Sequence, residues 1–95
     1  MSDDPSASTV QLPPVVDRGA VARLVGELRS AFAGGGAVTV DGGDVVQIGQ
    51  AGLQLLLSAT RTPGGTLRIS RASDELSSAI DLAGLRAPLA QAGAI

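Results

Sequence analysis

The spacing of apolar residues changes along the chain from the two-residue period of a strand to the longer period of a helix. Residues 9–12 alternate between polar and apolar, which predicts a short strand that the two prolines at 13–14 end. The two valines at 15–16 predict a second short strand, and Asp17 is suited to cap a helix after it. The chain is therefore expected to enter its first helix through two short extended segments.

The first helix is predicted over residues 19–33. The glycine run at 34–36 ends it, and a buried strand is predicted at 37–41 before a turn at 42–43. The apolar positions of this helix recur every three or four residues, so that they share one face. These positions are Val21, Leu24, Val25, Leu28 and Phe32.

The second half of the chain continues the alternation of helix and strand. A leucine-rich helix is predicted to run to about Arg61, and a Pro-Gly-Gly turn at 63–65 separates it from a strand at 66–70. A third helix is predicted from about Ser73, and Pro88 fits the first turn of a last short helix. Strands that alternate with helices predict an α/β fold with at least some parallel pairing.

Length and composition limit the classes of function. The 95 residues predict one domain, with a polar, disordered tail at 1–8 and a folded domain at 9–95. The chain has no cysteine and no histidine, which removes the usual zinc ligands and the usual base for a serine nucleophile, so catalysis is not expected. A net charge of −2 and a single aromatic residue argue against nucleic-acid binding. With no signal peptide and no long apolar run, we expect a cytoplasmic protein that does not insert into a membrane.

The segment 45–57 carries the strongest functional signal. It joins a β-branched run through Gly49 and Gly52 to a run of leucines, which is typical of a strand or tight loop that feeds a helix with an exposed N-terminus. At 100° per residue, the polar side chains of this helix fall in one stripe, opposite the leucines. The residues of this polar stripe are Gln50, Gln54, Ser58 and Arg61.

The block Ala-Gly-Leu-Gln-Leu-Leu at 51–56 resembles the start of the second helix in STAS domains, the family of the anti-sigma factor antagonists. The segment Leu-Pro-Pro-Val-Val-Asp at 12–17 looks like the short, proline-bearing entry of the single-domain bacterial members. The strand Val-Thr-Val-Asp at 38–41 resembles the central strand of the family, which ends in Asp. The resemblance extends from residue 9 to about residue 93.

The resemblance implies a mixed β-sheet of about four to five strands covered by about four helices, and no enzymatic activity. No cofactor and no metal are expected. It implies regulation by docking to a protein: an anti-sigma factor kinase, a histidine-kinase or chemotaxis component, or a lipid-transport ATPase that this chain would serve as an accessory subunit. Family members carry a phosphorylatable Ser or Thr after an acidic residue, where this chain has Gln50 after Gly49, so the phospho-switch is predicted to be lost or moved. The predicted partner-binding residues are Asp41, Gly49, Gln50, Ala51, Gly52, Gln54, Ser58 and Arg61.

Two small-ligand interpretations compete with docking. The N–H groups at the helix start, residues 49–53, could bind an anion or a nucleotide, or the glycines there could serve close packing, and the sequence favours neither. Asp41 and Asp44 could hold Mg²⁺, although two carboxylates in a turn more often cap it or stay solvated. The glycine run at 34–36 precedes a strand and lacks the Gly-Lys-Ser/Thr of a phosphate-binding loop, which excludes that motif.

Overall fold

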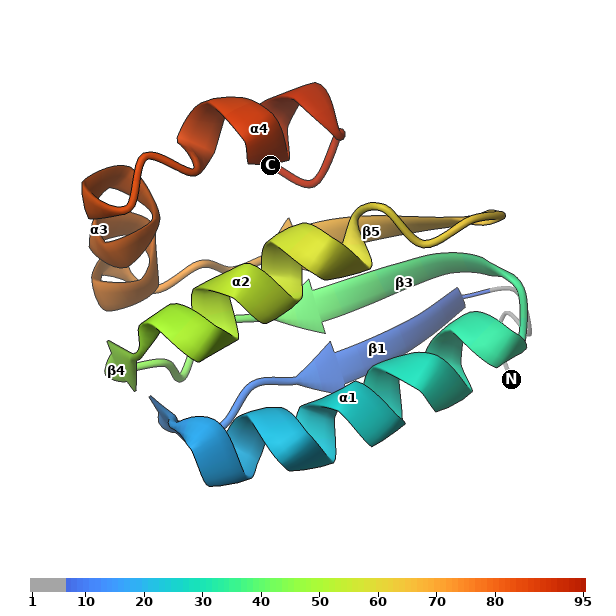
Figure 1. Ribbon diagram of the computed structural model, residues 1–95, viewed down its shortest axis with the longest axis horizontal. Coiled ribbons are helices and arrows are strands. Elements are labelled where there is room, and N and C mark those ends of the chain that lie inside the picture. Colours follow the sequence, from blue (N-terminus) through green and yellow to red (C-terminus); the bar gives the residue numbers. More distant parts are fainter. Residues whose placement is uncertain (1–6) are drawn as a thin grey trace.

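The computed structural model of the chain describes residues 7–95 (Figure 1). All four predicted helices are present in the predicted order, and none of the helices within this part of the chain is long and apolar enough to cross a membrane. The elements are β1 (Ala7–Gln11), β2 (Val15–Val16), α1 (Arg18–Ala33), β3 (Gly36–Asp41), β4 (Gln47–Ile48), α2 (Gln50–Ala59), β5 (Gly65–Ser70), α3 (Asp74–Leu82) and α4 (Arg86–Gln91).

The strands pair in two small sheets, and every pair within the described residues is parallel. In the larger sheet β3 lies between β1 and β5, with Val40 opposite Val10 on one side and Ile69 on the other. β2 and β4 form a separate two-stranded sheet. The predicted α/β class is confirmed. The expected single mixed sheet is instead two parallel ones, because a helix lies between the paired strands in sequence and returns the chain in the same direction.

The first strand begins earlier than the sequence predicts. β1 starts at Ala7, which pairs with Ala37, and Ser8 follows opposite Val38. The strand thus begins inside the predicted tail at 1–8, because backbone pairing with β3 extends it through residues 7–8. The rest of the predicted tail, residues 1–6, lies outside the described residues.

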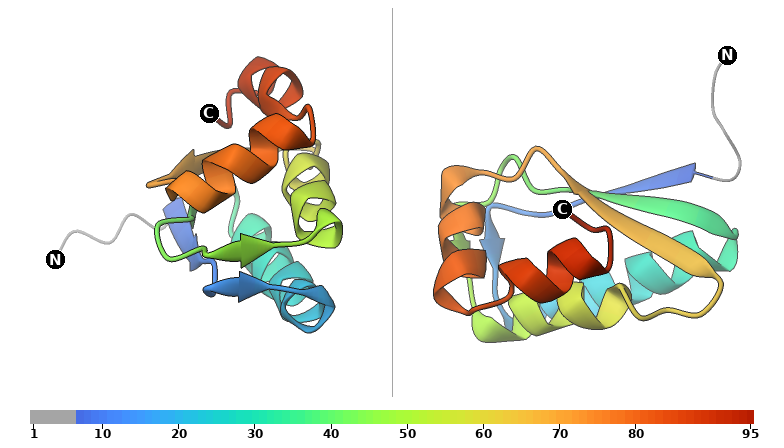
Figure 2. Two further views of the ribbon diagram at one scale, coloured as in Figure 1. Left: turned by 90° about the vertical axis from the view of Figure 1, so that its left-hand side faces the viewer. Right: turned by 90° about the horizontal axis from the view of Figure 1, so that it is seen from above.

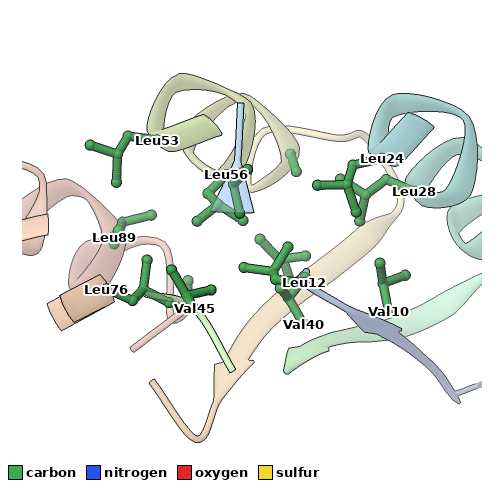
Figure 3. Close-up of a cluster of buried hydrophobic side chains, with 14 of the residues drawn as sticks. Val10, Leu12, Leu24, Leu28, Val40, Val45, Leu53, Leu56, Leu76 and Leu89 are labelled. Carbon is green, nitrogen blue, oxygen red and sulfur yellow. The ribbon is translucent and has the colours of Figure 1, made fainter. Parts of the chain in front are cut away.

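The core lies on one face of the three-stranded sheet. Helices α1, α2 and α4 all lie on that side, and α3 lies at the end of the molecule (Figures 1 and 2). Val10 and Val40 from the sheet face Leu24 and Leu28 from α1, and Leu56 enters from α2 (Figure 3). All of these side chains are at most 5% exposed, and they are aliphatic as the composition requires. Burial of each such side chain stabilises the fold by roughly 1.5 to 3 kcal/mol.

The other face of the sheet has no helix over it in the described part of the chain (Figure 2). The cross-strand neighbours Thr9, Thr39 and Arg68 lie in one register row, and Thr9 and Arg68 are exposed. This open face explains why the strands at 9–12 and 66–70 alternate between polar and apolar instead of being apolar throughout.

Asp17 caps α1, as its position predicts. Its Oδ1 accepts a hydrogen bond from the backbone N–H of Ala20 at 2.9 Å, and its backbone carbonyl accepts from the N–H of Val21 at 2.9 Å. The side chain thus satisfies one of the N–H groups that the first turn of a helix leaves free.

Replacing Asp17 with alanine is expected to lower the free energy of unfolding by about 1 kcal/mol, because the cap hydrogen bond is lost. Urea denaturation followed by circular dichroism measures the change. Asp17→Asn is the matched control, since its amide oxygen can still accept from Ala20. A loss with asparagine as large as the loss with alanine would show that the cap bond is not what stabilises the helix start.

Candidate functional site: the start of α2

The candidate site is the first turn of α2, which follows directly on β4. The N–H of Gly49 donates to the carbonyl of Val16 at 3.1 Å, and the N–H of Leu53 donates to the carbonyl of Gly49 at 3.2 Å. The first bond ties the helix start to β2, and the second is the first bond of the helix. Gly49 offers no side-chain cap, and Gly49, Gln50 and Ala51 are all exposed. A partner can therefore reach both the first turn and the Gln50 side chain.

The predicted polar stripe is exposed along its whole length, but it borders two different hollows. Gln50 and Gln54 line a hollow of about 390 Å³ between α2 and α3. Ser58 lines another, of about 450 Å³, between α1 and α2. Arg61 lies beyond the end of the helix, which stops at Ala59. The structure thus groups Gln50 with Gln54 and sets Ser58 and Arg61 apart from them.

The far wall of the α2–α3 hollow comes from α3. Leu82 on this wall is 90% exposed, more than any other large apolar side chain in the described residues. A further hollow of about 450 Å³ lies between α3 and β4, and the two hollows share Ala79 and Leu82. The left view of Figure 2 faces this end of the molecule, where β4, the start of α2 and α3 come together.

Sequence reasoning missed the contribution of α3 to this site. It predicted the third helix without giving any of its residues a part in the site. At 100° per residue, Leu82 falls on the side of α3 away from the core residues Leu76 and Ile80. The sequence thus has an apolar residue on the polar side of this helix, but a single such residue does not identify a site, and the wall emerges only from the way α3 lies against α2.

Gly52 is required by close packing. It is buried, and a Cβ there would lie 2.8 Å from Cγ1 of Ile48 and 2.8 Å from Cγ1 of Val16. Gly49 is different, because a Cβ there would meet nothing closer than the Val16 carbonyl at 3.9 Å. Of the two explanations left open for these glycines, packing accounts for Gly52. Because Gly52 is buried, it presents no exposed surface for the predicted contact with a partner.

Substitution of Gly52 by alanine is expected to destabilise the domain by about 0.5 to 2 kcal/mol. Overpacking against Val16 and Ile48 costs about 1 to 3 kcal/mol, and the higher helix propensity of alanine recovers up to about 1 kcal/mol. Thermal unfolding followed by circular dichroism measures the net change. Gly49→Ala is the comparison at a roomier position, and an equal loss at both positions would contradict the packing explanation.

The two carboxylates considered for Mg²⁺ act in the turn after β3. Oδ1 of Asp41 accepts from the N–H of Gly43 at 2.9 Å and from Nε of Arg71 at 3.3 Å. Oδ2 of Asp44 accepts from the side-chain amide of Gln11 at 3.2 Å. No group of three or more acidic side chains that could hold a metal ion occurs within residues 7–95. Asp41 therefore stabilises the turn, and its contact with a partner stays a prediction.

The whole arrangement is that of a small α/β domain in which the exposed start of α2 borders a hollow. A family model described as "Mlab, STAS domain" matches residues 1–91 of the chain. In the same comparisons no curated protein sequence and no solved structure matches it. The matched range covers every element from β1 to the end of α4. STAS domains are generally non-catalytic modules that mediate protein–protein interactions. The chain therefore belongs to the STAS domain family.

Proposed function

We propose that this protein is a non-enzymatic regulatory module that binds a protein partner through the start of α2, as its resemblance to anti-sigma factor antagonists implies. The observation that carries the proposal is the exposed first turn of α2 at the rim of a hollow. Gln50 and Gln54 offer amide donors and acceptors at this rim, and Leu53 and Leu85 line the hollow with apolar surface. Polar groups around an apolar depression are typical of a binding site.

Gln50 stands where the resembled family carries its phosphorylatable Ser or Thr. The amide of glutamine has no hydroxyl to accept a phosphoryl group, but it donates and accepts hydrogen bonds as a hydroxyl does. A phosphate there would place a charge of about −2 at the positive end of a helix, whereas glutamine keeps the position neutral. We infer a docking surface that remains in the state of an unphosphorylated family member.

Incubation with a kinase partner and ATP is therefore expected to leave the intact mass of the chain unchanged. The measurement is intact-protein mass spectrometry, and the matched variant is Gln50→Ser, which restores a hydroxyl at the position. Phosphate on the parent chain, at Ser58 or at another residue of α2, would show that the switch has moved and has not been lost.

A second candidate function is that of an accessory subunit of a lipid-transport ATPase. The observation in its favour is again Gln50, because such a role needs a docking surface and no phosphorylation. The block at 51–56 resembles both kinds of STAS protein. The two candidates, and a chemotaxis-associated role, share the surface and differ in the partner, so the identity of a captured protein decides between them.

Binding of an anion or nucleotide at the start of α2 is the remaining alternative. The exposed N–H groups near Gly49 support it, since a helix N-terminus attracts negative charge. A rise in melting temperature with added phosphate or nucleotide would favour it, because a ligand that binds only the folded state stabilises that state.

A photo-crosslinking amino acid introduced at position 54 tests the docking proposal directly. We expect it to capture a protein partner from native extract, whereas the same group at position 68 captures none. Arg68 is the control because it too is exposed but lies on the uncovered face of the sheet. Capture of the same protein with equal yield at both positions would place the interface elsewhere.

A further inference from the structure

The exposed Leu82 side chain lies between the two hollows along α3. A single exposed leucine is common on a protein surface and by itself indicates nothing. Leu82 differs because it and Ala79 line both hollows. One of these hollows includes Gln50 and Gln54, and the other reaches β4. The surface that Ala79 and Leu82 form on α3 is thus continuous with the site at the start of α2.

The hollow between α3 and β4, which Leu82 borders, also carries negative charge that has no ion-pair partner in the described part of the chain. Asp74 and Glu75 line the hollow between α3 and β4, both are exposed, and neither forms an ion pair within residues 7–95. No arginine lines either of the two hollows. The two acids also suit the positive end of α3, but this role does not neutralise them.

The other acidic residue of α3 is neutralised. Arg86 pairs with Asp81, and a hydrogen bond from its guanidinium holds the pKa of Asp81 below its usual value. The same guanidinium donates to the Ser77 hydroxyl at 2.7 Å. Neither Asp81 nor Ser77 lines either of the two hollows, so the acidic residues that border a hollow together with Leu82 are the two without an ion-pair partner in the described residues.

We propose that the partner docks here with a basic, apolar segment, which packs an apolar side chain against Leu82 and Ala79 and places Lys or Arg side chains next to Asp74 and Glu75. The inference deepens the proposed function, on which it rests, by naming the chemistry of the partner. Charge complementarity selects this occupant, because an acidic or neutral segment would leave the two carboxylates unpaired. The apolar contact would give affinity, and the charges would give orientation.

Selection from a library of random peptides displayed on phage, with the full chain as bait, tests the inference. We expect the selected peptides to combine large apolar residues with a net positive charge. A synthetic copy of the strongest binder, measured by fluorescence anisotropy, is expected to lose about tenfold or more in affinity with Leu82→Ser, and likewise with Asp74→Lys combined with Glu75→Lys. Ile95→Ser, at an apolar residue that is 41% exposed and lines neither hollow, is the matched control and is expected to leave the affinity unchanged.

Three results would overturn the inference. The first is selection of acidic or uncharged peptides. The second is a basic peptide whose affinity is the same for Leu82→Ser and for the parent chain. The third is a parent chain that is dimeric in size-exclusion chromatography with light scattering and becomes monomeric with Leu82→Ser, because the hollows would then be covered by a second copy.

The inference and the proposed function fail in different ways. If a native partner is crosslinked from position 54 but its affinity does not depend on Leu82, the docking proposal stands and the basic segment is excluded. If no partner is captured from position 54, the docking proposal itself fails.

Discussion

A chain in which Leu56 is replaced by alanine is expected to have a free energy of unfolding about 2 to 5 kcal/mol lower than the parent. Leu56 is 1% exposed and enters the core from the middle of α2 (Figure 3). Its truncation removes apolar contacts and leaves a cavity, which α2 cannot fill by moving because Gly52 already packs against β2 and β4. Small domains are stable by only about 5 to 15 kcal/mol in total, so the loss is a large part of the whole.

Urea denaturation followed by circular dichroism is the suitable measurement, since the chain has no Trp or Tyr to report by fluorescence. Leu82→Ala is the matched control, because it removes the same atoms from a side chain that is 90% exposed and is expected to change stability by less than about 0.5 kcal/mol. Similar losses for the two leucines would contradict the assignment of Leu56 to the core.

Replacement of Gln50 by glutamate is expected to separate stability from binding. The new carboxylate lies in the first turn of α2, where it interacts favourably with the helix dipole by roughly 0.3 to 1 kcal/mol. The same charge partly imitates a phosphate, which in the resembled family turns partner binding off. We therefore expect the melting temperature to hold or rise while the affinity for the partner falls at least about tenfold, or about 1.4 kcal/mol.

The parts of the fold that depend on local chemistry could be predicted from the sequence. Asp17 caps α1 as expected, and Ser73 caps α3 with its hydroxyl, which accepts from the N–H of Leu76 at 3.0 Å. Gly84 ends α3 with a φ of +71°, a conformation that glycine adopts without steric cost. These signals act within a few residues, so the sequence pattern contains them in full.

The pairing of the short strands could not be predicted, because it depends on residues far apart in the chain. β2 and β4 have only two residues each. They form strands because Val15 pairs with Gln47 and Val16 pairs with Ile48. The same pairing decides between close packing and anion binding as the reason for Gly52. It brings Val16 and Ile48 into the space beside this glycine. Only the tertiary structure brings these groups together.

The sequence predicted the α2 side of the candidate site but not the α3 side. The exposure of Gln50 and Gln54 follows from the helical period of α2. The wall that faces them depends on how α3 docks, which Leu76 and Ile80 determine from within the core. For that reason the sequence grouped Ser58 with Gln50 along one stripe, whereas the structure places them at different hollows.

Calorimetric titration of the captured partner with the parent chain and with Gln50→Glu, at one fixed salt concentration, tests the central claim most directly. Gln50→Ala is the control that removes the amide without adding a charge. The proposed docking surface predicts at least about a tenfold higher Kd for Gln50→Glu than for the parent, with an unfolding temperature that is no lower. A Gln50→Glu chain that binds the partner as tightly as the parent would contradict the claim that the start of α2 is the docking site.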